Sequence, residues 1–245
     1  MTRITARAIA DWSDPSQPTV MTADEATYAL HALGPRVRFI KTLPIGASML
    51  DAGAGNGSSI LFRTWPAPER PDLAMFAWSG EPGEFFDRFD GHEIGYWPQR
   101  PPGFGGRTFD AVLCANFIEH IDDPLVFIRH CIGRLTRRAR LYLEWPRPES
   151  IDLPSTEDLA VAGVPVTTGR YHDDCTHRAV PPTLQDVVNT LTEAGLRVTE
   201  QGIVRVPMID QQVAIHARRS GDRVGMTLAY WSVTGWCQYL AAEVG

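Results

Sequence analysis

Residues 48–60 constrain the fold of this chain more than any other stretch. They begin apolar, reach an acidic residue at Asp51, and then place glycines at alternate positions, Gly53, Gly55 and Gly57. Glycine adopts positive φ angles at little cost and lets a ligand approach the main chain closely. The pattern predicts a buried strand, a tight turn and the start of a helix. A nucleotide-type pocket is expected at the carboxyl end of that strand.

The spacing of the glycines distinguishes between nucleotide-binding folds. A dinucleotide fingerprint has the form G-x-G-x-x-G, and counting from Gly53 and Gly55 its third glycine would fall at Ser58. No G-x-x-x-x-G-K occurs, which excludes a P-loop. The pattern L-D-x-G-x-G-x-G, from Leu50 to Gly57, instead resembles the first motif of class I S-adenosylmethionine-dependent methyltransferases. The alternative is a strand-to-helix turn that binds no ligand.

A second stretch, residues 109–124, carries the more distinctive resemblance. Residues 109–115 read as a strand, and Asp122 or Asp123 caps a helix with Pro124 at its first position. The pattern F-D-x-V…E-H-x-x-D-P is similar to the fourth-strand region of the small-molecule branch of class I methyltransferases.

This resemblance covers roughly residues 30–245 and implies an α/β fold. We expect a Rossmann-like seven-stranded, mostly parallel sheet with the last strand antiparallel and helices on both faces. Residues 1–20 are expected to be a flexible arm. Residues 21–245 are expected to form a single methyltransferase-like domain with a lid or acceptor loop at about 146–180. The expected strands lie at 48–52, 72–79, 92–97, 109–115 and 141–145, and within 196–206 and 227–244.

The resemblance also implies S-adenosyl-L-methionine as cofactor and assigns residues to it. An acid at the end of the second strand normally holds the ribose; here that position is Ser79, so Glu81 takes the role and Ser79 is the fallback. Trp97, after the third strand, stacks on the base or is a half-buried core aromatic. The remaining expected cofactor-binding residues are Asp51, Gly53, Gly55, Gly57, Asn116 and Phe117.

The polar segment at 146–180 supplies the expected acceptor-side residues. His177 or His172 could be a general base, since a neutral imidazole suits that task near pH 7. The same histidines with Asp173 and Asp174 could bind a divalent metal, although their spacing matches no established motif, and we assign no metal site. The third interpretation is that the aspartates and His177 only hold the loop together. The expected catalytic residues are His177, His172, Asp174 and His120.

The composition limits the classes of molecule that this chain is expected to bind and the compartment in which it is expected to work. Hydrophobic residues make up 44% of the 245 residues, charged residues 21%, and the net charge is −6, which argues against a nucleic-acid-binding protein. No apolar run reaches membrane-span length, and no signal-peptide pattern is visible. The four cysteines lack C-x-x-C spacing, so we expect reduced thiols in a cytoplasmic protein. The last 40 residues could support a homodimer.

The expected function is methyl transfer to a small polar acceptor, a sugar or specialised-metabolite hydroxyl or amine. One rival is a catalytically inactive, methyltransferase-like binding or scaffold protein, favoured by the missing acids after the second and third strands. The other is a nicotinamide-dependent oxidoreductase, and Ser58 in place of the third glycine counts against it.

Overall fold

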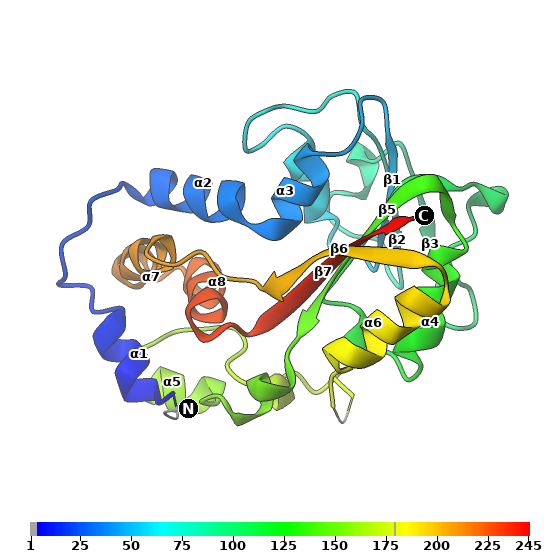
Figure 1. Cartoon of the computed structure of the whole chain (residues 1–245). Helices are drawn as coiled ribbons and strands as arrows, with labels where there is room; N and C mark the ends of the chain where they lie inside the picture. Colours follow the sequence, from blue (N-terminus) through cyan, green and yellow to red (C-terminus); the bar gives the residue numbers. More distant parts are fainter. Residues whose placement is uncertain (1–3, 179) are drawn as a thin grey trace. The chain divides into compact units, whose positions relative to one another are not determined.

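The computed structural model describes residues 4–178 and 180–245, and its centre is a seven-stranded sheet (Figure 1). The strand order is β3-β2-β1-β4-β5-β7-β6. Pairing is parallel from β3 through β5, whereas β7 runs antiparallel to both of its neighbours. The predicted fold is therefore confirmed. The strands are β1 (Ser48–Ala52), β2 (Ala74–Ser79), β3 (Gly91–Ile94), β4 (Phe109–Ala115), β5 (Leu135–Pro146), β6 (Leu196–Ile203) and β7 (Cys237–Val244).

Short helices and single turns connect these strands. Within the described part of the chain, no helix is long and apolar enough to cross a membrane. The α-helices are α1 (Ala6–Trp12), α2 (Ala23–Leu33), α3 (Pro35–Lys41), α4 (Pro124–Ile132), α5 (Thr156–Val161), α6 (Leu184–Glu193), α7 (Ile209–Ser220) and α8 (Arg223–Thr234). The 3-10 turns are η1 (Ser58–Arg63), η2 (Phe86–Arg88), η3 (Phe104–Gly106), η4 (Ile118–His120), η5 (Pro148–Asp152) and η6 (Tyr171–Asp173).

The chain divides into two compact units, each with its own apolar core. We call residues 35–145, 178–202 and 239–245 the sheet unit, and residues 4–34, 146–177 and 203–238 the helical unit. In the sheet unit, α4 and α6 lie side by side (Figure 1) and pack their apolar faces on the buried strands, with Phe127 and Val187 in the same core cluster as Val112. In the helical unit, α7 and α8 form the centre of the core, with Val213 and Tyr230 among its members.

Helices at both ends of the chain build the core of the helical unit. Helix α1 packs Ile9 into the core of the helical unit, and Arg218 donates a hydrogen bond to the carbonyl oxygen of Ala10 at 2.8 Å. Residues 223–234 form α8, and the expected last strand occupies the later part of the range 227–244, as β7. Asp222 accepts hydrogen bonds from two first-turn amides of α8, and Gly235 ends the helix at φ 64°.

The crossover after β1 is a 3-10 turn rather than an α-helix. The sequence predicts the start of a helix after the glycines, and the segment forms η1, a six-residue 3-10 turn that starts after Gly57 at φ 81°. Pro66 and Pro68 follow within five residues and prevent a longer helix. Strand β5, in contrast, begins six residues before the predicted residue 141, so Arg137, Arg138 and Arg140 belong to this strand.

Candidate functional site

The glycine loop follows β1 at the carboxyl edge of the parallel strands. Gly53, Gly55 and Gly57 have φ angles of 91°, 56° and 81°, a region that residues with a Cβ rarely adopt. The amides of Gly53 and Ala54 both donate to the carbonyl oxygen of Trp78 at 2.9 Å, which ties the loop to the end of β2. The backbone therefore requires glycine at all three positions, as the sequence predicts.

Side chains of the protein fill the space beside two of these glycines. A Cβ built on Gly53 would lie 2.3 Å from Cγ of Phe117, and one on Gly57 would lie 2.9 Å from Cδ1 of Phe86. Nothing lies within 4 Å of a Cβ built on Gly55. Of the three, Gly55 is the glycine that faces open space and can let a ligand reach the main chain.

This difference predicts unequal effects of alanine substitution. We expect Gly55→Ala to cost about 1 kcal/mol of unfolding free energy, because only the left-handed backbone conformation is strained. We expect Gly53→Ala to cost about 3 kcal/mol or more, since the new methyl group also collides with the Phe117 ring. Urea unfolding of both variants measures the difference. Equal costs would show that the ring moves aside freely.

Asp51 lies beneath the loop as a buried carboxyl group. Its exposed fraction is 4%, and it accepts a hydrogen bond from the hydroxyl of Ser59 in η1. Burial raises the pKa of Asp51 to about 6, against the opposing effects of the Ser59 hydrogen bond and the nearby positive charge of Arg36. The carboxyl group therefore changes charge near neutral pH.

An ion pair from α3 stands at the carboxyl end of β5. Arg36 donates to both carboxylate oxygens of Glu144, and the hydroxyl of Tyr142 donates to the same carboxylate at 2.6 Å. The Glu144 side chain is 6% exposed and that of Arg36 is 30% exposed. Sequence reasoning did not identify Arg36, a basic residue that directly follows Pro35.

The ribose candidates lie where β2 ends. Ser79 is the last residue of β2, and the carboxylate of Glu81 accepts a hydrogen bond from the hydroxyl of Tyr96 at 2.9 Å. The Tyr96 ring also lies over Gly80, 2.7 Å from where a Cβ would be. Tyr96, which the sequence analysis did not single out, is the exposed aromatic residue beside the ribose candidates.

Trp97, in contrast, packs toward the interior. Its ring meets Phe127 edge to face at a centroid distance of 5.0 Å and His130 at 5.6 Å, both on α4. These contacts favour the second interpretation of Trp97, a half-buried core aromatic.

Beyond β4, the chain turns sharply over the glycine loop. Asn116 has φ 52°, and its backbone N–H donates a hydrogen bond to the backbone carbonyl oxygen of Glu144 at 2.8 Å. Phe117 then packs between Gly53 and the Trp78 ring, whose centroid is 5.5 Å away. The structure thus brings Asp51, the three glycines, Asn116 and Phe117 together at one edge of the sheet.

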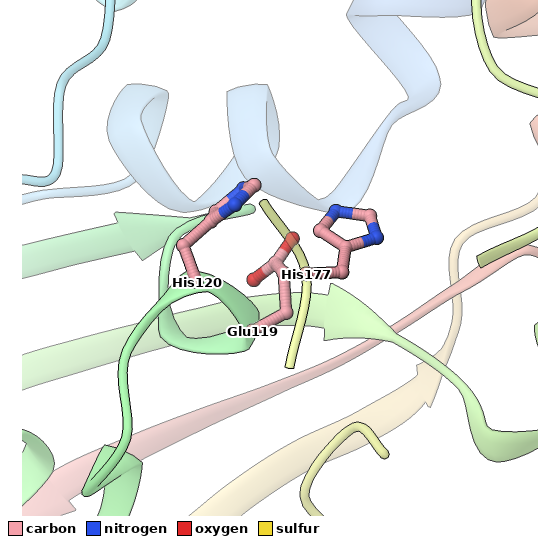
Figure 2. Close-up of side chains that lie close together, drawn as sticks. All are labelled: Glu119, His120 and His177. Carbon is pink, nitrogen blue, oxygen red and sulfur yellow. The ribbon is translucent and has the colours of Figure 1, made fainter. Parts of the chain in front are cut away.

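Glu119 and His120 follow on η4. Figure 2 shows both side chains rising from this turn, and Glu119 is 1% exposed. His177, labelled in the same figure, belongs to the helical unit.

The remaining catalytic candidates also lie in the helical unit, around η6. Nδ1 of His177 lies 2.6 Å from the carbonyl oxygen of Tyr171, and the two rings stack at 4.5 Å. A carbonyl oxygen can only accept, so Nδ1 carries the proton and Nε2 holds the lone pair in the neutral ring. Asp174 accepts from the amide and hydroxyl of Thr176 at 2.9 and 2.6 Å. His172 is exposed.

Asp173 has a structural role in the same loop. Its carboxylate accepts from the amide and hydroxyl of Thr156 and from the side chain of Arg170. These hydrogen bonds lower the pKa of Asp173 despite its partial burial. They support the interpretation that this aspartate holds the loop together. The catalytic roles of His177, His172, Asp174 and His120 stay predictions.

The sequence of this chain was compared with those of known proteins. No family model matches the chain. It is 30% identical over 129 residues to a ubiquinone biosynthesis O-methyltransferase of Xanthomonas axonopodis pv. citri (strain 306), over 49% of this chain and 53% of that protein. The chain thus spans about half the length of the curated relative it matches.

Solved structures match over most of the chain. Coclaurine N-methyltransferase, bound to N-methylheliamine and SAH, aligns with a TM-score of 0.56 and 12% identity, over 96% of this chain and 80% of that chain. The cyclopropane synthase MmaA2 from Mycobacterium tuberculosis aligns with a TM-score of 0.53 and 16% identity, over 96% of this chain and 93% of that chain. A SAM-dependent methyltransferase from Archaeoglobus fulgidus aligns with a TM-score of 0.50 and 14% identity, over 84% of this chain and 90% of that chain. This chain has the class I methyltransferase fold.

The two cysteines of the sheet unit are core residues rather than nucleophiles. Cys114, on β4, and Cys131, on α4, are buried and free. Burial raises the pKa of Cys131 to about 12 and that of Cys114 well above its usual value. Both thiols stay protonated at neutral pH and act as core residues.

Proposed function

We propose that this chain binds S-adenosylmethionine at the glycine loop and transfers its methyl group to a small polar acceptor, a hydroxyl or amine of a sugar or specialised metabolite. The observation that carries the proposal is Gly55, which faces open space beside Asp51 in a methyltransferase fold. The relatives support it, since one is named an O-methyltransferase and a solved neighbour is an N-methyltransferase with SAH bound.

The residues around the loop fit such a cofactor. Gly55 leaves its backbone open to a ligand, and the buried Asp51 beneath it offers negative charge to the cationic methionine end. Glu81 reaches the ribose hydroxyls once the Tyr96 hydroxyl moves from its carboxylate. Asn116 and Phe117 form the wall that faces β1.

The chemistry needs little from the protein beyond positioning. Held at the glycine loop, S-adenosylmethionine would supply an activated methyl group for the acceptor oxygen or nitrogen, with its sulfur keeping the bonding electron pair. Holding the two partners in line provides most of the rate. A hydroxyl acceptor must also lose its proton, and the sequence predicts His177 or His172 as the base that takes it.

Binding of S-adenosylhomocysteine tests the proposal. We expect calorimetry to give a dissociation constant in the micromolar range, and Glu81→Gln to weaken it about tenfold, because a charged hydrogen bond to a ribose hydroxyl is worth roughly 1.5 kcal/mol. Asp87→Asn, which removes another exposed carboxylate, on η2, is the control and should leave affinity unchanged.

Failure of this experiment would have a defined meaning. No binding by the parent chain would favour the scaffold alternative. Equal losses in both variants would remove Glu81 from the ribose site. The homodimer predicted from the sequence stays a prediction.

A further inference from the structure

The sheet unit contains a cavity of about 510 Å³ beside the carboxyl ends of β4 and β5. Two segments line it, residues 118–126 after β4 and residues 178–186 at the start of α6, of which 179 is not described. Trp145 near the end of β5 donates to the carbonyl oxygen of Pro182 at 2.8 Å, which fixes the second segment to the sheet. A volume of this size suits a small molecule.

Much of the lining is apolar. Ile118 and Ile121 are buried at 1% and 8% exposure, whereas Val126 and Val180 at the rim are 55% and 67% exposed. Exposed valines beside a cavity indicate a ligand with an apolar body, because its binding would remove that surface from water.

The charges of the rim are predominantly negative. Three exposed acidic residues line the cavity, Asp122, Asp123 and Asp186. The basic residue of the lining is Arg178, whose guanidinium forms an ion pair with Asp122 at 3.1 Å. The N-termini of α4 and α6 each add about half a positive charge. The rim therefore keeps about one net negative charge.

We propose that this cavity binds the methyl acceptor and that the acceptor is a small organic cation, an apolar body that carries a protonated amine. The methyl group goes to a hydroxyl of that body, or to the amine nitrogen once it has given up its proton and regained its lone pair. The term acceptor rests on the proposed function; the preference for a cation rests on the cavity alone. An uncharged sugar would match neither the apolar wall nor the acidic rim. A carboxylate-bearing molecule would be repelled.

Three probes with the same ring and different charge test the preference. Phenethylamine, 2-phenylethanol and 3-phenylpropanoate are titrated into the whole chain by calorimetry at low ionic strength. We expect the amine to bind about tenfold more tightly than the alcohol, the anion to bind most weakly, and 0.5 M NaCl to narrow the difference. Equal affinities, or tighter binding of the anion, would overturn the proposal.

Charge variants locate the site. Asp123→Asn should weaken amine binding about threefold and leave alcohol binding unchanged; Asp123 makes no side-chain cap hydrogen bond to α4, so its replacement is structurally mild. Arg178→Gln should strengthen amine binding. Asp87→Asn, an exposed acid of η2 outside the lining, is the matched control. If Asp123→Asn behaves like this control, the amine does not bind in the cavity.

The two proposals fail separately. S-adenosylhomocysteine is titrated into the same samples. Loss of its binding with the amine preference intact would overturn the proposed function and leave a cation site. Normal binding with the probe order reversed would overturn only the inference about the acceptor.

Discussion

Replacing Asp51 with asparagine should stabilise the protein at neutral pH while lowering its affinity for S-adenosylhomocysteine at least tenfold. The pKa of Asp51 is raised from 3.8 to about 6 by burial, so the folded state holds this proton more tightly than the unfolded state. The stabilising contribution is fully present below pH 4 and is lost as pH rises through 6. About two pKa units correspond to about 3 kcal/mol.

The Asp51→Asn variant carries no charge at this position. We expect its unfolding free energy to exceed that of the parent by about 3 kcal/mol at pH 8 and to match it below pH 4, measured by urea unfolding across this range. Affinity for S-adenosylhomocysteine should fall at least tenfold at pH 8. A buried carboxylate retained at a cost in stability is what a ligand-binding role explains.

Asp110 provides a control, because its pKa is lowered whereas that of Asp51 is raised. Its carboxylate accepts from the amide and hydroxyl of Ser48 and from the hydroxyl of Thr136, and these bonds lower its pKa. Its contribution is present above the unfolded pKa and is lost as pH falls through the folded pKa. Asp110→Asn should therefore destabilise the chain at pH 8 and leave cofactor affinity unchanged. A loss of stability in Asp51→Asn at pH 8 would contradict the assignment.

Replacing Arg36 with alanine should have the other large effect. Glu144 is 6% exposed on its side chain and would keep only the Tyr142 hydroxyl among its described hydrogen-bond donors. Removing one member of a buried pair costs about 3 kcal/mol or more, because the remaining charge is left without its partner. Urea unfolding of Arg36→Ala at pH 7 measures this loss.

A double variant separates lost pairing from lost packing. Adding Glu144→Gln to Arg36→Ala should recover more than half of the lost stability, since the amide carries no charge. The pKa of Asp51 should also rise further in Arg36→Ala, because the Arg36 charge holds it down. A double variant no more stable than Arg36→Ala would show that the arginine acts through its apolar stem.

The features of this protein that could be predicted from its sequence are those set by residues close together along the chain. The glycine spacing after β1 identified three residues with positive φ, because only the absence of a Cβ permits that backbone. Asp123-Pro124 marked the start of α4, and apolar runs marked β2 and β4, because these features act within a few residues along the chain. The sheet and its antiparallel last strand followed from the resemblance that these motifs carry.

Contacts between distant segments were decided only by the tertiary structure. The ring that fills the space beside Gly53 comes from Phe117, 64 positions later, and Arg36 finds its partner 108 residues away at Glu144. The division into two units and the helical course of residues 209–234 likewise depend on which core each segment joins. Sequence patterns report one residue's neighbours along the chain, whereas packing selects neighbours across space. The sequence alone therefore determined where the glycine loop stands, and only the fold determined which side chains surround it.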